Sequence, residues 1–232
     1  MEKVVMIMCE RRNEILIYVF FLLIMVLTVM NKRNLFRDEV YSYTLANNID
    51  SIFVDFEEGQ VYTSPEQLFL DSIAVNNVEE QFNFKNVWKN QKNDVHPPLY
   101  YLILHIVCSL NTGRFSIWYA ASINICFAIM TLYVLRKLIG RFVNDDAVVN
   151  FGSILFIIST GVLQNVTLFR MYTMAMFWIT LIAYLFVWAF EEKFSWKLWL
   201  SLGITAVASA LTHYYCIIYL CATCLVQRFF NI

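Results

Sequence analysis

Charged residues are scarce in this sequence. Only 15% of its 232 residues are Asp, Glu, Lys or Arg, whereas 59% are hydrophobic and 17% are aromatic. Soluble domains carry about 25% charged residues, and the mean hydropathy of +0.58 is too apolar for a water-exposed surface. The scarcity of charge therefore excludes an ordinary soluble domain and predicts an integral membrane protein that contacts the lipid bilayer.

Several patterns that support particular functions are also missing. No basic stripe with interleaved aromatic residues occurs, so the sequence offers no support for nucleic-acid binding. We find no Gly-rich phosphate loop, no metal-ligand triad and no Ser/His/Asp pattern, and we therefore predict no cofactor. A divalent metal ion stays conceivable beside adjacent carboxylates, but a carboxylate pair alone does not indicate one. Of the six cysteines, Cys221 and Cys224 have CxxC spacing without a second ligand pair, which favours ordinary apolar helix residues.

Hydrophobic runs predict an all-α fold, a polytopic bundle of membrane helices. Residues 15–30 follow Arg11 and Arg12 and precede no small-residue cleavage site, which indicates an uncleaved first transmembrane helix with a cytoplasmic N-terminus. Further apolar runs cover residues 99–110, 115–135, 147–163, 171–190 and 198–230. The last run is too long for one helix, so we predict two segments that turn at His213.

Residues 31–95 form the one long polar segment. Its mixture of polar and apolar residues predicts an extracytoplasmic loop with short helices on the membrane surface, including one from about residue 38 to 48. We interpret residues 1–232 as a single transmembrane domain: first helix 15–30, loop 31–95, and remaining membrane helices 96–232. Residues 164–170 are expected to be a short polar loop.

The positive residues predict which helix ends share a side, because cytoplasmic segments are enriched in Lys and Arg. Four segments then lie in the cytoplasm: the N-terminus, 136–141, 191–197 and Arg228. The opposite side receives Asp38, Glu39, His96, Arg170, Tyr172, His213 and Tyr214. This assignment requires that residues 99–110 lie against the membrane or dip into it. If they cross it, Arg170 moves to the cytoplasmic side.

Each polar candidate has a functional and a structural interpretation. Asp38, beside Glu39, could act as a general base at the outer end of the first helix, or it could simply cap the next helix. His96 precedes Pro97 and could contact a phosphate, or it could fill polar space at the interface. Arg170 suits phosphate binding, although arginines at helix ends also extend toward water without a ligand.

His213 lies within an apolar run, where a polar side chain is costly. That cost makes it a candidate functional residue. The structural alternative is a packed histidine that forms a hydrogen bond with a neighbouring helix.

Three motifs occur in a recognisable order: Arg37-Asp38-Glu39-Val40-Tyr41, His96-Pro97-Pro98-Leu99-Tyr100-Tyr101 and Arg170-Met171-Tyr172. In this order and spacing the chain resembles the GT-C membrane glycosyltransferases. Within them it is most similar to the bacterial branch akin to protein O-mannosyltransferases and the lipid A aminoarabinose transferase. Members of the family usually have more helices, so we expect this chain to correspond to an N-terminal part, truncated at the C-terminus.

The resemblance implies a polyprenyl-phosphate-linked sugar donor, a lipid, glycan or protein acceptor, and transfer with inversion on the extracytoplasmic side of the cell membrane. It implies that Asp38 is the catalytic base with Glu39 beside it. His96 and Arg170 are expected at the donor phosphate. Supporting positions are expected at Tyr41, Tyr100, Tyr172, His213 and Tyr214.

Two other functions remain open at this point. A transporter or flippase of a lipid-linked precursor could use Arg170 and His96 to bind phosphate without chemistry; internal repeats would favour it, and none is found. An inactive membrane remnant is the other alternative. It predicts that segment 31–95 makes no ordered contact with Arg170 or His213.

Overall fold

The computed structural model describes residues 2–49, 58–59, 61, 72–191 and 195–229. These residues form helices and connecting segments with no strand among them, which confirms the all-α fold class. The helices are α1 (Glu2–Met30), α2 (Arg37–Asn47), α4 (Phe84–Gln91), α5 (Leu99–Ser109), α6 (Ile117–Phe142), α7 (Asp146–Ile158), α8 (Thr160–Thr167), α9 (Tyr172–Glu191), α10 (Trp196–Ala210) and α11 (Tyr214–Phe229).

Three helices in the described part of the chain are long and apolar enough to cross a membrane. They are Arg12–Met30 within α1, the whole of α6, and Tyr172–Phe190 within α9. Helices α7 and α8 pass the same criterion only as a pair, and they meet at a bend of 52°. These lengths are compatible with the predicted membrane protein, because a bilayer core of about 30 Å needs roughly 20 apolar residues.

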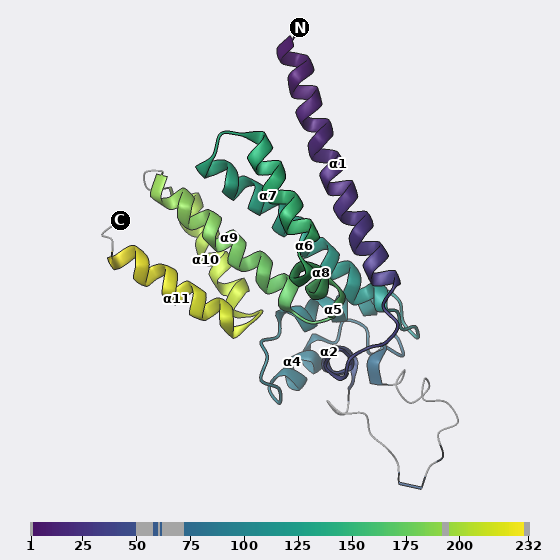
Figure 1. Cartoon of the computed structure of the whole chain (residues 1–232). Helices are drawn as coiled ribbons and strands as arrows, with labels where there is room; N and C mark the ends of the chain where they lie inside the picture. The colour runs from purple at the N-terminus through teal and green to yellow at the C-terminus, as the bar shows by residue number, and fades with distance from the viewer. Residues whose placement is uncertain (1, 50–57, 60, 62–71, 192–194, 230–232) are drawn as a thin grey trace.

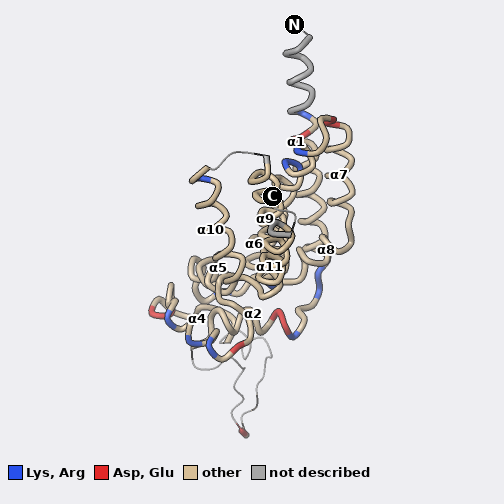
Figure 2. Tube along the Cα trace, turned by 90° about the vertical axis from the view of Figure 1, so that its left-hand side faces the viewer, with Lys and Arg blue, Asp and Glu red and all other residues tan. Residues whose placement is uncertain are grey.

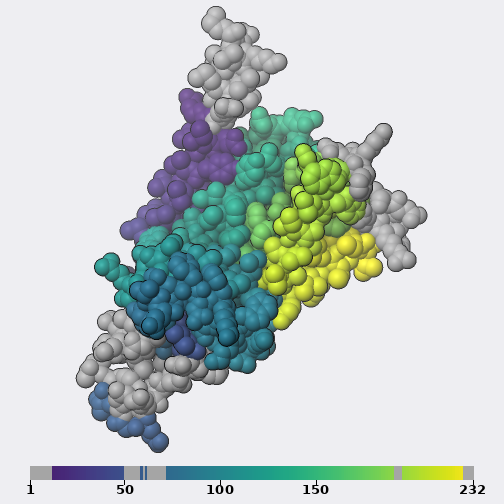
Figure 3. All heavy atoms as spheres, turned by 180° about the vertical axis from the view of Figure 1, so that it is seen from behind, coloured from purple at the N-terminus to yellow at the C-terminus, as the bar shows by residue number. Residues whose placement is uncertain are grey.

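The long helices lie side by side in a slanted bundle (Figure 1). Helix α6 packs along α9, while α1 contacts α6, α7 and α8, and α10 contacts α9 and α11. Helices α2, α4 and α5 pack on one another and form a layer at one end of the bundle, which we call the site end. Figure 3 shows this layer in blue, below the purple α1 and beside the yellow-green C-terminal helices.

Charged residues gather at the two ends of the bundle (Figure 2). At the end opposite the site end, Arg136 lies 3.8 Å from Glu14 and donates a hydrogen bond to Asn150, while Arg141 packs on the ring of Tyr184. The helix sides between the two ends carry mainly apolar residues, including many exposed ones. A surface of this kind suits a lipid environment, where each exposed charge would be costly.

Helix α5 is too short to cross a bilayer. Its 11 residues span about 16 Å at the α-helical rise, roughly half of the hydrocarbon thickness. The N–H of Leu99 donates to the carbonyl of Leu211 at 2.9 Å, and Ser109 at the other end accepts from the N–H of Phe82 at 3.1 Å. Both ends of α5 are thus hydrogen-bonded to other segments at the site end.

Two predicted segments differ from the structure. The run 147–163 is not one continuous helix, and residues 164–170 are not simply a loop, because α7 ends at Ile158 and α8 continues to Thr167. Ser159 between them has an extended backbone with φ −62° and ψ 120°. Ser159, Thr160 and Gly161 are all weak helix formers, which explains why the break occurs there. The predicted turn at His213 does separate α10 from α11.

The position of α5 can be tested with single cysteines in a variant that lacks the native ones. We expect Val95→Cys and Asn111→Cys, which flank α5, to react with a membrane-impermeant maleimide from the same side of sealed vesicles. Asn144→Cys between α6 and α7 should react from the other side, since α6 is long enough to span. Labelling of positions 95 and 111 from opposite sides would show that α5 crosses.

Candidate functional site

Four helices begin close together at the site end, and each start carries one of the polar candidates. Asp38 lies in the first turn of α2, His96 precedes α5, Arg170 precedes α9 and His213 precedes α11. Prolines at 97 and 98 suit the start of α5, because the first helical turn does not need their N–H groups. Helix N-termini carry partial positive charge, and the first turn of α2 also carries the carboxylates of Asp38 and Glu39.

Arg170 lies at the centre of this cluster. Its side chain is buried, with only 5% of the residue exposed. The guanidinium Nη1 donates to the backbone carbonyl of Asp38 at 2.9 Å, Nη2 lies 3.3 Å from His96 Nε2, and Nε has no hydrogen-bond partner. No carboxylate within the described residues forms an ion pair with this guanidinium. A buried cation without a counter-ion is costly, and an anionic ligand would offset that cost.

His96 is held between Arg170 and an acidic residue. Its Nδ1 lies 2.9 Å from Asp94 Oδ2, which also accepts the backbone N–H of His96 at 3.2 Å. Its ring is 6.2 Å from that of His213, measured between centroids. His96 therefore connects the segment before α5 with the starts of α9 and α11.

His213 lies among aromatic side chains in the turn between α10 and α11. The ring of Tyr172 is 5.6 Å away and that of Tyr215 is 4.6 Å away, and the backbone N–H of Tyr215 donates to His213 Nδ1 at 3.1 Å. Burial lowers the pKa of His213, and its electrostatic interactions with His96 and Arg170 lower it further. The imidazole is consequently neutral at pH 7.

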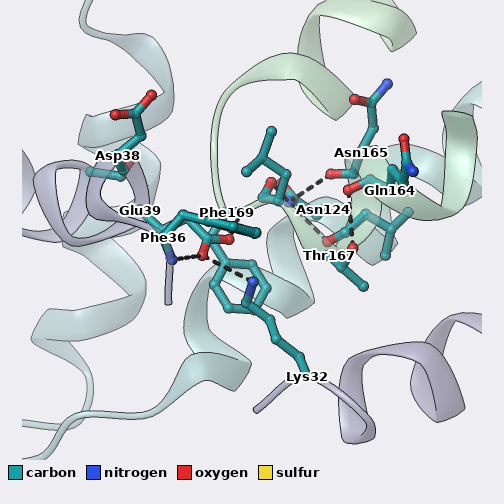
Figure 4. Close-up of polar contacts among 12 residues, drawn as sticks. Lys32, Phe36, Asp38, Glu39, Asn124, Gln164, Asn165, Thr167 and Phe169 are labelled. Carbon is teal, nitrogen blue, oxygen red and sulfur yellow. Dashed lines mark hydrogen bonds and ion pairs between the residues drawn. The ribbon is translucent and has the colours of Figure 1, made fainter. Parts of the chain in front are cut away.

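Asp38 and Glu39, adjacent in sequence, occupy opposite environments. Asp38 is exposed, and its side chain points away from Glu39 (Figure 4). Its carboxylate is thus the one carboxylate of this pair that a ligand can reach. The hydrogen bond from Arg170 to its carbonyl keeps the start of α2 beside the basic cluster.

Glu39 is completely buried, and both of its carboxylate oxygens have partners. Oε2 lies 2.9 Å from Lys32 Nζ and accepts the N–H of Phe36 at 2.7 Å, while Oε1 accepts the N–H of Phe169 at 2.8 Å (Figure 4). The bond to Phe36 is the glutamate half of a capping box at the start of α2. Glu39 was expected to take part in catalysis beside Asp38. This placement does not suit that role, because a sugar-accepting substrate cannot contact a carboxylate that has no exposed surface.

The carbonyl groups at the end of α8 are satisfied by Asn124 of α6. Its Nδ2 donates to the carbonyls of Asn165, Val166 and Leu168 at 3.3, 3.1 and 2.8 Å (Figure 4). The last of these precedes Phe169 directly. Asn124 and Glu39 therefore hold the segment before Arg170 from two sides.

The predicted supporting residues separate into three groups. Tyr172 and His213 belong to the cluster through their ring contact. Tyr100 is buried beneath it, with a hydroxyl that has no hydrogen-bond partner, and Tyr214 is 52% exposed beside it. Tyr41 instead accepts a hydrogen bond from Arg37 on the outer side of α2.

Three residues of the site were missed in the sequence: Asp94, Lys32 and Asn124. Asp94 stands two residues before His96, a spacing that allows contact between the side chains and could have pointed to it. Lys32 lies seven residues before Glu39 and also packs on the ring of Phe169, and Asn124 bonds to the end of α8; no local sequence pattern marks either residue.

The chemistry that the site offers is a buried guanidinium without an ion pair, bonded to the backbone of Asp38, whose carboxylate is exposed. No group of three or more His, Cys, Asp or Glu side chains that could hold a metal ion occurs in the described ranges. Cys221 and Cys224 are free and exposed on α11. Comparison with known proteins adds no assignment: no protein family, no curated protein and no solved structure matches this chain.

The adjacent carboxylates give a matched test of stability. We expect Glu39→Ala to destabilise the protein by about 3–5 kcal/mol, because it leaves the buried Lys32 cation without its partner. Asp38→Asn should change stability by less than about 0.5 kcal/mol, since the carboxylate is exposed. Thermal unfolding in detergent measures both, and equal losses would contradict the distinction drawn between them.

Proposed function

We propose that the chain is a membrane glycosyltransferase that takes its sugar from a polyprenyl-phosphate donor. The observation that carries the proposal is the buried Arg170 guanidinium, which has no anionic partner among the described residues and lies beside the exposed Asp38. A phosphate would supply the missing negative charge, and arginine suits phosphate oxygens well. The resemblance to the GT-C glycosyltransferases points to the same chemistry.

The donor suits this position for a second reason. The electropositive helix starts lie at one end of a bundle whose sides are largely apolar. A polyprenyl phosphate has a charged head and a long hydrocarbon tail, so its head can reach Arg170 while its tail stays in lipid. On the charge distribution of the sequence, we place this end on the extracytoplasmic side of the cell membrane.

Asp38 acts as the general base in the proposed reaction. It takes the proton from an acceptor hydroxyl as that oxygen attacks the anomeric carbon from the face opposite the phosphate. The new glycosidic bond forms as the bond to the phosphate oxygen breaks, so the configuration inverts and the electron pair leaves with the polyprenyl phosphate. Arg170 stabilises the charge that develops on that leaving group. Glu39 has no direct part in this scheme; it holds the start of α2 instead.

The base is tested by sugar transfer in reconstituted membranes. Asp38→Asn should lower the rate by about 100-fold or more, the range typical of a lost general base. Glu79→Gln removes an exposed carboxylate elsewhere in the segment and should transfer at the wild-type rate. If Asp38→Asn and wild type transfer equally, Asp38 is not the base.

The phosphate site is tested by substitution of its arginine. Arg170→Gln should reduce donor turnover by about 100-fold or more, because the developing phosphate charge loses its stabilising cation. Arg170→Lys should recover only part of this loss, since lysine keeps the charge but cannot form two parallel hydrogen bonds. The control is Arg114→Gln, an exposed arginine between α5 and α6. The assignment fails if Arg170→Gln and Arg114→Gln behave alike.

A transporter or flippase of a lipid-linked phosphate is the second candidate. The break between α7 and α8, at 52°, favours it, because broken helices often lie beside substrate sites in transporters. The two functions separate in sealed vesicles that contain donor and acceptor. Consumption of the donor with formation of a glycoside supports the transferase, whereas movement of intact donor between leaflets without consumption supports the transporter.

A further inference from the structure

The contact between Arg170 and His96 indicates which ring nitrogen of the histidine accepts a hydrogen bond. A guanidinium has only donors, so Nη2 of Arg170 donates and Nε2 of His96 accepts across 3.3 Å. His96 is then neutral, its proton is on Nδ1, and that N–H donates to Asp94 Oδ2 at 2.9 Å. Asp94 Oδ2 also accepts the backbone N–H of His96, so the ring nitrogen and the backbone of His96 are both bonded to Asp94 and the ring orientation is fixed.

An anion that binds Arg170 changes the balance at this contact. In a neutral His96 the lone pair of Nε2 faces the guanidinium. This lone pair would repel a phosphate oxygen that bound between His96 and Arg170. With a proton on Nε2, His96 becomes a second charged donor to the same anion. The negative charge of Asp94, 2.9 Å from Nδ1, favours the protonated ring.

His213 is less able to take up this proton. Its Nδ1 already accepts the N–H of Tyr215, and protonation there would break that bond. Burial and its electrostatic interactions with His96 and Arg170 lower its pKa, so the nearby ring stays neutral when His96 is charged. The titratable and charged groups that contact His96 in the described residues are Asp94, Arg170 and His213, and Asp38, Tyr101 and Tyr172 lie around Arg170 and His213.

We propose that Asp94 is a positioning residue that holds His96 ready to take up one proton when an anionic donor headgroup binds Arg170. This inference rests on the proposed function, because the anion is the phosphate of the lipid-linked donor. The proton comes from solvent and is bound at His96 Nε2; no covalent bond changes in this step. The site thus gains its second cation only when the anion is present.

The test measures binding of citronellyl sulfate to the full chain in detergent between pH 6 and pH 8. A sulfate ester keeps a single negative charge throughout this range, so any pH dependence comes from the protein. We expect affinity to rise as pH falls, by up to tenfold per pH unit, the limit for uptake of one proton. Calorimetry in two buffers with different ionisation enthalpies counts the protons bound with each probe, and we expect net uptake.

Three variants identify the groups involved. His96→Gln should bind the probe with no pH dependence. Asp94→Asn should move the pH dependence downward by on the order of one pH unit, because the imidazolium loses its charged partner. A merely structural role of Asp94 would lower affinity equally at every pH. Glu79→Gln should reproduce the wild-type curve, and thermal unfolding confirms that each variant is folded.

The outcomes separate this inference from the proposed function. Binding that depends on Arg170, with a pH dependence lost in His96→Gln and shifted in Asp94→Asn, supports both. Binding that depends on Arg170 without proton uptake, or with the same pH dependence in His96→Gln, overturns the inference and leaves the phosphate site standing. Binding that is unchanged in Arg170→Gln overturns the phosphate site and the inference together.

Discussion

The buried carboxylate of Glu39 is the interaction on which the candidate site depends. It accepts N–H groups from Phe36, at the start of α2, and from Phe169, one residue before Arg170, while Lys32 after α1 neutralises it. The connection between α1 and α2 and the segment before Arg170, which are far apart in the chain, meet at these two oxygens. Because a buried charge is stable only with its partners in place, the geometry of the segments is tightly specified. The hydrogen bonds of Glu39 to Phe36 and Phe169 therefore help to fix the positions of the neighbouring Asp38 and Arg170.

The convergence of four helix starts gives the site end its chemical character. Each start contributes partial positive charge, and Arg170 adds a full charge with an unbonded Nε. The surrounding acceptors are a backbone carbonyl and a ring nitrogen of His96, neither of which carries a negative charge. The result is a place that favours an anion at the end of an apolar bundle. A lipid with an anionic head matches both properties, which is why the resemblance to lipid-dependent glycosyltransferases and the geometry lead to the same proposal.

Sequence patterns located most of the helices because apolar runs and their interruptions are local properties. The helix at 37–47 and the turn at His213 appear close to their predicted positions. The bend at Ser159 was missed, although the weak helix formers Ser159, Thr160 and Gly161 mark it locally, because the apolar run continues through it. The pairing of Asp38 with Glu39 as one functional unit was also misleading. Neighbours on a helix point in directions about 100° apart, so one can be exposed while the other is buried.

The sequence by itself determined that the chain is helical and apolar, and that polar residues recur at the ends of its apolar runs. Hydrophobic content and the length of each run suffice for that, since they reflect the cost of exposing backbone and charge to lipid. Only the tertiary structure decided which of those polar residues meet, which carboxylate is reachable, and that Asp94 and Lys32 belong beside them. The contacts of Arg170 with Asp38 and His96, for example, join residues 132 and 74 positions apart. No local pattern encodes them, because they follow from how the helices pack.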